Sequence, residues 1–252
     1  MAGIVIFNGP FVSGKTVYAN ALEKISRSSY PGIEIKRIAD GTHLVAEIKD
    51  IAHGKDGDCI SDSHCHPWVE RPEGGHHHLG LELNSHFPFT VRVTDVTDAM
   101  IRAFLSELSS ISQIPNLDLI IAELGTGIPD GKISKVQLTT SRFLEIARKQ
   151  PFWDSVKKKI IGIVTFDVKW GQRLERDNRP QLADGVNESW SVNVDAMNIT
   201  REPDFAPWMT EFPPEMIVPI DNNGTMRKDK TDEICLRQLR PVLSIIESNL
   251  TL

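Results

Sequence analysis

Short apolar runs alternate along the chain with stretches whose apolar residues recur at helical spacing. The runs expected to form strands cover residues 3–8, 33–39, 117–124, 159–168 and 216–220. The stretches expected to form helices cover residues 15–26, 96–111, 139–149, 169–176 and 230–247. Asp98 is a candidate cap for the second of these helices, and Thr139, Thr140 or Ser141 for the third. This alternation predicts an α/β protein with a largely parallel sheet.

Two long stretches do not follow this alternation: residues 41–95 and about 180–214. Because long irregular segments in a compact domain are usually lids or binding loops, we interpret both as insertions in a single domain of residues 1–252. The second stretch contains Trp190, Phe205, Trp208 and Phe212. Such aromatic side chains either stack on a base or anchor a long loop to its own domain.

Composition and charge narrow the class of protein. The chain has 252 residues, of which 40% are hydrophobic and 25% charged, and a net charge of −6. These values are typical of a globular domain, and the acidity argues weakly against a general nucleic-acid binder. No apolar run is long enough to span a membrane, and the N-terminus does not have the pattern of a signal peptide. With three cysteines, Cys59, Cys65 and Cys235, we expect reduced thiols and a cytoplasmic location.

A phosphate-binding motif follows the first expected strand. Residues 9–16, Gly-Pro-Phe-Val-Ser-Gly-Lys-Thr, match G-x-x-x-x-G-K-[ST] at every defined position and precede an expected helix. The glycines let backbone N–H groups wrap around phosphate oxygens, and the helix N-terminus adds positive charge. Lys15 is expected on the β- and γ-phosphates and Thr16 on Mg²⁺. Gly9, Ser13, Gly14, Lys15 and Thr16 are therefore candidate nucleotide-binding residues.

Two further segments accompany this motif. The strand that ends near Asp167 leads into a charged helix, where Arg173, Arg176 and Arg179 recur at three-residue steps and so share one helix face. Residues 220–225, Ile-Asp-Asn-Asn-Gly-Thr, form a turn before the last helix. Each segment also has a simpler interpretation. The arginines could lie on a solvated helix with ion pairs, and residues 220–225 could form an ordinary tight turn.

Together with the motif, these segments resemble the nucleoside and nucleotide kinase branch of the P-loop proteins, which includes shikimate-type kinases. The resemblance implies a three-layer α/β sandwich, with a five-stranded parallel sheet in the order 2-3-1-4-5 and helices on both faces. It implies an acceptor-binding insertion at residues 41–95, and a lid with an extended loop at residues 173–214. Arg173, Arg176 and Arg179 would close over ATP, and Asn222 and Asn223 would lie near the adenine.

Two acidic residues end expected strands. Glu123 closes the strand at 117–124, and Asp40 follows the strand at 33–39. Active groups gather beyond the carboxyl ends of parallel strands, where a carboxylate can hold Mg²⁺ or take a proton from an acceptor hydroxyl. In shikimate-like kinases an Asp near the position of Asp40 contacts the acceptor or the metal. The alternatives are a turn residue for Asp40 and a surface carboxylate for Glu123.

The insertion at residues 41–95 contains all eight histidines of the chain: His43, His53, His64, His66, His76, His77, His78 and His86. With Cys59 and Cys65, the residues at 64, 66 and 76–78 offer ligands for Zn²⁺, although their spacing matches no standard zinc pattern. Neutral His side chains could equally hydrogen-bond an acceptor. The third alternative is a polar loop of biased composition. The family resemblance favours acceptor contacts.

The sequence therefore predicts an ATP- and Mg²⁺-dependent kinase that phosphorylates a hydroxyl or phosphate of a nucleoside, nucleotide or related small molecule. A non-nucleotide metabolite and a hydroxylated base in DNA are alternative acceptors, the latter disfavoured by the negative charge. A regulatory nucleotide-binding protein is the alternative of another class, but no guanine-reading N-K-x-D element is present. A metal-binding interaction module is a third class, and the intact Lys15 and Thr16 argue against it. The sequence is compatible with an oligomer and predicts no membrane partner.

Overall fold

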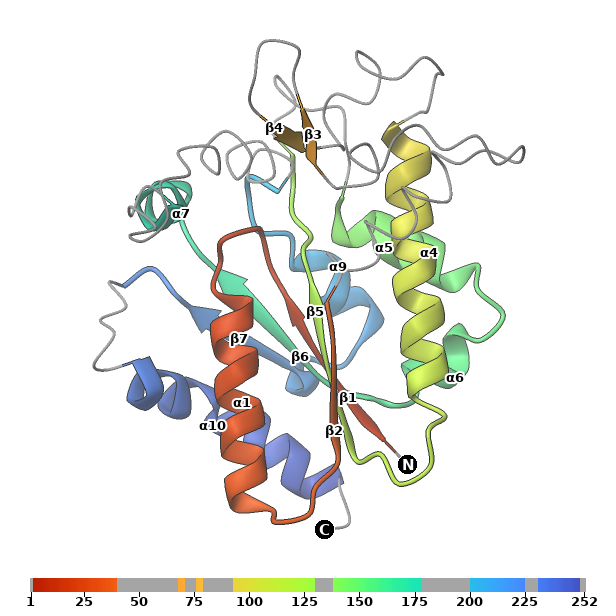
Figure 1. The fold of residues 1–252 in the computed structure, drawn as a ribbon, viewed down its shortest axis with the longest axis vertical. Helices are drawn as coiled ribbons and strands as arrows, with labels where there is room; N and C mark the ends of the chain where they lie inside the picture. The colour runs from red at the N-terminus through yellow and green to blue at the C-terminus, as the bar shows by residue number, and fades with distance from the viewer. Residues whose placement is uncertain are drawn as a thin grey trace.

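A computed structural model of the protein describes residues 2–39, 68–70, 76–78, 93–129, 138–177, 200–224 and 231–249. Its main sheet has five strands in the order β2-β5-β1-β6-β7, all paired in parallel (Figure 1). These strands are β1 (Gly3–Asn8), β2 (Ile35–Ala39), β5 (Leu119–Leu124), β6 (Ile160–Asp167) and β7 (Ile217–Asp221). Numbered along the main sheet alone, the order is 2-3-1-4-5, which confirms the predicted α/β fold class.

The central strand β1 is buried throughout because helices cover both faces of the sheet. Its side chains alternate between two apolar clusters: Ile4 and Ile6 belong to one, and Val5 and Phe7 to the other. A strand covered on both faces reads as a continuous apolar run, which is why residues 3–8 were recognisable as a strand.

The helices form a layer on each face of the sheet (Figure 1). The layer over Val5 and Phe7 consists of α1 (Lys15–Ser29) and α10 (Thr231–Asn249). The layer over Ile4 and Ile6 consists of α4 (Val93–Ile111), α5 (Thr140–Arg148), α6 (Trp153–Lys157) and α9 (Ala206–Glu211). The short helix α7 (Trp170–Asp177) follows β6, and the single 3-10 turn η2 (Pro214–Met216) precedes β7.

The predicted caps have different outcomes. Thr139 caps α5 as predicted, since its hydroxyl accepts a hydrogen bond from the Arg142 N–H at 3.1 Å. Asp98 was predicted to cap the helix at 96–111, and this is wrong: α4 begins at Val93, so Asp98 lies inside the helix. There its carboxylate pairs with the Arg142 side chain, with Nε 2.9 Å from Oδ1. The carboxylate is therefore used in a contact between α4 and α5.

The segment after residue 200 is part of the core rather than a loop over the sheet. Trp208 in α9 has no exposed side-chain surface, and its ring centroid lies 5.8 Å from those of both Phe143 and Phe212. Of the two roles considered for these aromatic residues, Trp208 and Phe212 have the anchoring one. Trp190 lies outside the described residues.

Within the insertion at 41–95, the structure describes β3 (Trp68–Glu70), β4 (His76–His78) and the start of α4. β3 and β4 form a two-stranded antiparallel sheet in which Trp68 pairs with His78. His43, His53, His64, His66, His86, Cys59 and Cys65 lie outside the described residues. The acceptor and zinc predictions for this segment stay predictions.

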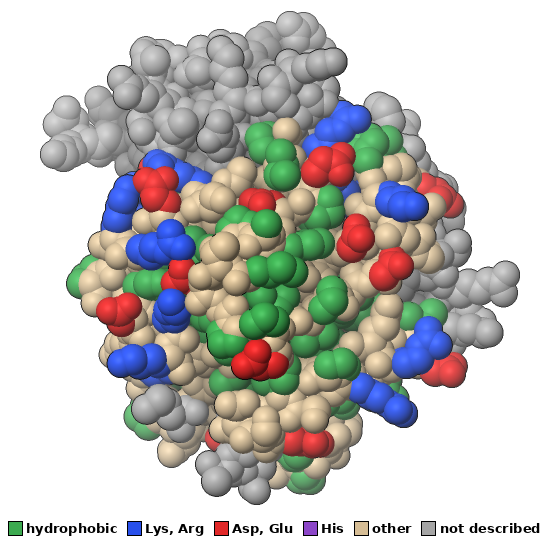
Figure 2. All heavy atoms as spheres, turned by 180° about the vertical axis from the view of Figure 1, so that it is seen from behind, with side chains coloured by type: hydrophobic (Ala, Val, Ile, Leu, Met, Phe, Trp, Pro, Cys, Tyr) green, Lys and Arg blue, Asp and Glu red, His purple; other side chains and the backbone are tan. Residues whose placement is uncertain are grey.

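The outer surface combines scattered charges with apolar side chains. Figure 2 shows the face opposite that of Figure 1, with a band of apolar side chains down its middle. A groove of about 670 Å³ runs between the edge strand β7 and α10. Pro219 in β7 has no N–H to offer a further strand, which is a common protection of a sheet edge. None of the described helices is long and apolar enough to cross a membrane.

Candidate nucleotide-binding site

The loop between β1 and α1 contains the phosphate-binding motif and has the backbone that the motif requires. Gly14 has a φ of +97°, and a Cβ at this position would lie 2.7 Å from the Asn222 side-chain nitrogen. A Cβ at Gly9 would lie 2.9 Å from the Phe166 Cβ. Both glycines are thus required by close approach, and Gly14 also by its left-handed conformation.

Lys15 is the first residue of α1, and its ammonium group bends back over the loop. Its Nζ donates hydrogen bonds to the carbonyl oxygens of Gly9 at 2.9 Å and Pro10 at 3.1 Å. The Phe11 ring centroid lies 5.6 Å away. Only 9% of Lys15 is exposed, so its charge lies close to the loop backbone, where a phosphate chain would be cradled.

The predicted metal-binding pair, Thr16 and Glu123, is brought together by the fold. The Thr16 hydroxyl donates a hydrogen bond of 2.6 Å to Glu123 Oε2. Glu123 lies next to Phe7 in β1 and Ala39 in β2, on the same face of β5 as Leu119 and Ile121. That face is covered by α1, which explains why a residue at the end of β5 meets the first turn of α1.

The donor atoms of this pair fit a Mg²⁺ ion. A hydroxyl and a carboxylate oxygen are hard ligands of the kind that Mg²⁺ prefers. Glu123 is only 4% exposed, so its carboxylate is kept close to the loop. Among the described residues there is no group of three or more His, Cys, Asp or Glu side chains that could hold a metal by themselves. Substrate phosphates and water would therefore complete the coordination.

Asp40, the other predicted acidic residue, lies outside the described residues, as do Arg179 and Thr225. The described strand β2 ends at Ala39, which pairs directly with Glu123. Asp40 therefore follows, in the sequence, the residue that pairs with Glu123. Its predicted role stays a prediction.

The guanidinium of Arg173, a predicted lid residue, contacts the backbone of the phosphate-binding loop, and its predicted place over ATP stays a prediction. Arg173 is fully buried, and its guanidinium donates to the carbonyl oxygens of Phe11 at 3.1 Å, Thr200 at 2.9 Å, and Arg201. Burial lowers the pKa of Arg173 to about 10, so the group is still charged at neutral pH. The contact with Phe11 makes Arg173 a support of the phosphate-binding loop.

Arg176 and Asn222 also contact this loop. The Asn222 side chain donates to the Ser13 carbonyl at 2.7 Å, and the Arg176 guanidinium lies 3.5 Å from the same oxygen. Arg176 also donates to the carbonyls of Asn222 and Gly224, which joins α7 to the turn after β7. The motif, the helix with the arginines and the turn before α10 were recognised separately in the sequence, and they form one cluster.

Asn223 has a structural contact of its own. Its side chain donates to Asp221 Oδ1 at 2.7 Å and accepts from the Lys169 N–H at 2.6 Å. The hydrogen bonds from the Asn223 side chain and N–H lower the pKa of Asp221. Asn223 thus holds together the ends of β6 and β7, and its predicted place near the adenine stays a prediction.

Sequence reasoning missed the segment at residues 200–202. The Thr200 hydroxyl accepts a hydrogen bond of 3.0 Å from the Phe11 N–H, across 189 residues of sequence. Glu202 exchanges two backbone hydrogen bonds with Ile128, at 2.8 and 3.0 Å. A Cβ at Gly127, three residues after β5, would lie 2.7 Å from the Glu202 carbonyl oxygen, so this glycine is required by close approach. Thr200 has no local sequence signal that would single it out.

Comparisons with known proteins found only distant structural similarities. No protein-family model matches the sequence, and no curated protein matches it. Among solved structures, it is similar to an unliganded sugar kinase from Janibacter sp. HTCC2649, with 10% identity, a TM-score of 0.42, and coverage of 97% of this chain and 98% of that one. It is also similar to shikimate kinase from Acinetobacter baumannii in complex with shikimate, with 13% identity, a TM-score of 0.42, and coverage of 97% and 94%. These values support no conclusion about the reaction or the substrate.

The role of Arg173 can be tested by stability. We expect Arg173→Lys to lower the free energy of unfolding by about 1–3 kcal/mol, because one ammonium group cannot serve three separated carbonyls and at least one stays buried without a donor. Urea unfolding followed by circular dichroism measures this. Glu175→Gln on the same helix, at an exposed position, is the control. Equal stability of both variants would contradict the supporting role.

The contact of Gly127 predicts a second stability difference. We expect Gly127→Ala to destabilise the protein by about 1–3 kcal/mol, because backbone must move to admit the methyl group. Gly171→Ala in α7 is the matched control, since nothing lies within 4 Å of its Cβ position. Alanine is also the better helix former, so the control is expected to stabilise by up to about 0.5 kcal/mol. Thermal melts of the two variants compare these effects, and an unchanged Gly127→Ala protein would show that the close packing is absent.

Proposed function

We propose that the protein is an ATP- and Mg²⁺-dependent phosphotransferase that phosphorylates a hydroxyl or phosphate of a small acceptor. One observation carries this proposal: Lys15 lies over the phosphate-binding loop while Thr16 faces Glu123 at the carboxyl edge of the sheet. A kinase needs this combination, because phosphoryl transfer depends mainly on positioning and on stabilisation of charge.

The chain's own residues have distinct parts in this proposal. Backbone N–H groups of residues 9–16 would bind the phosphates, and Lys15 would exchange its bonds to Gly9 and Pro10 for phosphate oxygens. Thr16 and Glu123 would hold Mg²⁺, which when bound neutralises charge on the β- and γ-phosphates. Arg176 would add positive charge beside the loop from α7, with Arg179 further along the chain.

The contacts of Glu123 favour the metal role over that of general base. One carboxylate oxygen accepts from Thr16, the other is paired with Arg37, and the residue is almost completely buried. A general base must reach the proton of the acceptor hydroxyl. We therefore propose Asp40 for that task, at the end of the neighbouring strand.

A nucleoside, a nucleotide or a related small molecule is the acceptor we propose, bound with the help of the insertion at residues 41–95. Neutral His side chains there could hydrogen-bond hydroxyl groups or phosphate. We also propose a cytoplasmic location. With only three cysteines in the chain, reduced thiols are the simplest interpretation, and they are kept in that state in the cytoplasm.

The direct test is phosphoryl transfer from labelled ATP to a panel of acceptors. The panel contains nucleosides, nucleoside monophosphates, non-nucleotide hydroxylated metabolites and hydroxymethylated DNA, and Lys15→Ala is the control. Transfer of label to one acceptor, lost in the control, establishes the activity and its acceptor together. Tight ATP binding or hydrolysis without transfer to any acceptor would contradict the proposal and favour a regulatory nucleotide-binding protein.

A further inference from the structure

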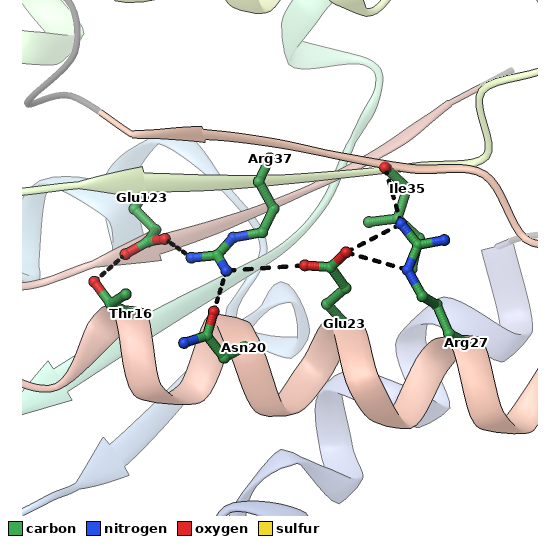
Figure 3. Close-up of polar contacts among 7 residues, drawn as sticks. All are labelled: Thr16, Asn20, Glu23, Arg27, Ile35, Arg37 and Glu123. Atoms are coloured by element: carbon green, nitrogen blue, oxygen red, sulfur yellow. Dashed lines mark hydrogen bonds and ion pairs between the residues drawn. The ribbon is translucent and has the colours of Figure 1, made fainter.

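The carboxylate of Glu123 is held on both sides, as Figure 3 shows. Its Oε2 accepts the hydrogen bond from Thr16 of α1, at 2.6 Å. Its Oε1 is paired with the guanidinium Nη2 of Arg37, which comes from β2. Each oxygen therefore has a partner from a different element, and the carboxylate plane is fixed relative to the first turn of α1.

The fold explains why Arg37 reaches this carboxylate. Arg37 pairs with Ile121, two residues before Glu123, and lies on the same face of the sheet as the buried Ile35. Its side chain can therefore run along the strand direction toward the carboxyl edge. The other terminal nitrogen donates to Asn20 Oδ1 of α1 and lies 3.8 Å from Glu23 Oε2. The guanidinium is thus clamped between α1 and β5.

We propose that Arg37 is a positioning residue, which orients Glu123 so that Oε2 faces the Mg²⁺ that accompanies ATP. This inference rests on the proposed function. Mg²⁺ demands nearly ideal geometry from its ligands, so the direction of one carboxylate oxygen matters. In other metal sites, mutation of a residue that hydrogen-bonds a metal-binding side chain commonly lowers metal affinity or activity about 10–100-fold.

An opposing effect must be weighed, because a guanidinium also repels a divalent cation. Arg37 bonds to the oxygen that faces away from Thr16, and 27% of its side chain is exposed to screening water. Repulsion of the metal is therefore weak beside the effect of orientation. Loss of Arg37 should weaken metal binding rather than strengthen it.

A purely structural role for Arg37 would be to tie the edge strand β2 to α1. The chain contains a matched control for this role in Arg27, which is also drawn in Figure 3. Arg27 of α1 pairs with Glu23 at 3.0 Å and donates to the Ile35 carbonyl of β2 at 3.4 Å. It joins the same two elements, but none of its described contacts is with Glu123.

The experiment compares ATP affinity in Mg²⁺ with ATP affinity in EDTA, by titration calorimetry on the full chain. The ratio of the two affinities reports the metal site without turnover. We expect Arg37→Gln to reduce this ratio about 10-fold or more, while affinity in EDTA changes less than about twofold. Arg27→Gln should leave the ratio within about twofold of wild type. Arg37→Lys keeps the charge without the planar fork, and it should reduce the ratio about 10-fold.

Three outcomes would overturn the inference. An unchanged ratio in Arg37→Gln, or in Arg37→Lys where the first variant does not fold, removes the positioning role and leaves the proposed kinase intact. An equal reduction in Arg27→Gln shows that Arg37 acts only through the packing of β2 on α1. A wild-type protein that binds ATP equally well in Mg²⁺ and EDTA removes the metal role of Thr16 and Glu123, and the role of Arg37 with it.

Discussion

Lys15→Ala is expected to lower the rate constant kcat/KM for phosphoryl transfer from ATP by about 10³-fold. The substitution removes the cation that would stabilise negative charge on the phosphate chain during transfer. The ammonium is held over the loop by the carbonyls of Gly9 and Pro10 and is almost completely buried. A charge in such a site acts with little screening by water. Single-turnover transfer from labelled ATP, with the acceptor found in the panel, measures the loss.

The matched control for this prediction is Lys24→Ala on the same helix. Lys24 is exposed and lies more than two turns further along α1. We expect its transfer rate to stay within about twofold of wild type, as for most surface substitutions away from a site. Circular dichroism should show both variants folded. A Lys15→Ala protein with more than a tenth of wild-type activity would rule out the proposed role of this lysine.

Trp208→Ala is expected to lower the free energy of unfolding by about 3–5 kcal/mol, the range for large aromatic residues removed from a core. Trp208 has no exposed surface and packs between Phe143 and Phe212, in the cluster that covers one face of the sheet. The cavity left by the indole cannot close without moving α5 and α9. A urea titration measures the change as a shift of the midpoint with an unchanged slope.

The neighbouring residue provides the control for the packing of α9. Met209 follows Trp208 directly, and 62% of it is exposed. Met209→Ala should change stability by less than about 0.5 kcal/mol. If both variants are equally stable, α9 is a surface loop, as the irregular sequence before it suggested, and not part of the core.

The strands and long helices were predictable because their apolar patterns are local. The buried run at residues 3–8 and the spacing at residues 15–26 correspond to β1 and α1, with the helix continuing to Ser29. The two shortest described α-helices were not predicted. Helices α6 and α9 have 5 and 6 residues, so each has too few turns to show a helical period. The error at Asp98 has a different cause: the apolar pattern of a helix fixes its first residue less well than its middle.

The candidate site divides in the same way. Glu123 could be selected from sequence because it ends an apolar strand, and the fold then places it against Thr16. Arg37 could not be selected, although an arginine near the end of an expected strand, on the face of Ile35, was a weak signal. Its importance depends on an ion pair with Glu123, which lies 86 residues away in the sequence. Arg173 was selected for its helix position, but its burial was not visible.

The sequence by itself determined the phosphate-binding loop, the alternation of strands and helices, and the acidic residue at the end of a strand. These features depend on residues that are neighbours along the chain, where spacing and side-chain type act directly on the backbone. Only the tertiary structure decided that Arg173, Asn222 and Thr200 support the loop, that Arg37 holds Glu123, and that Trp208 belongs to the core. These contacts join segments that are distant in the sequence. Their energies come from burial, hydrogen bonds and ion pairs between those segments, so no local sequence pattern indicates them.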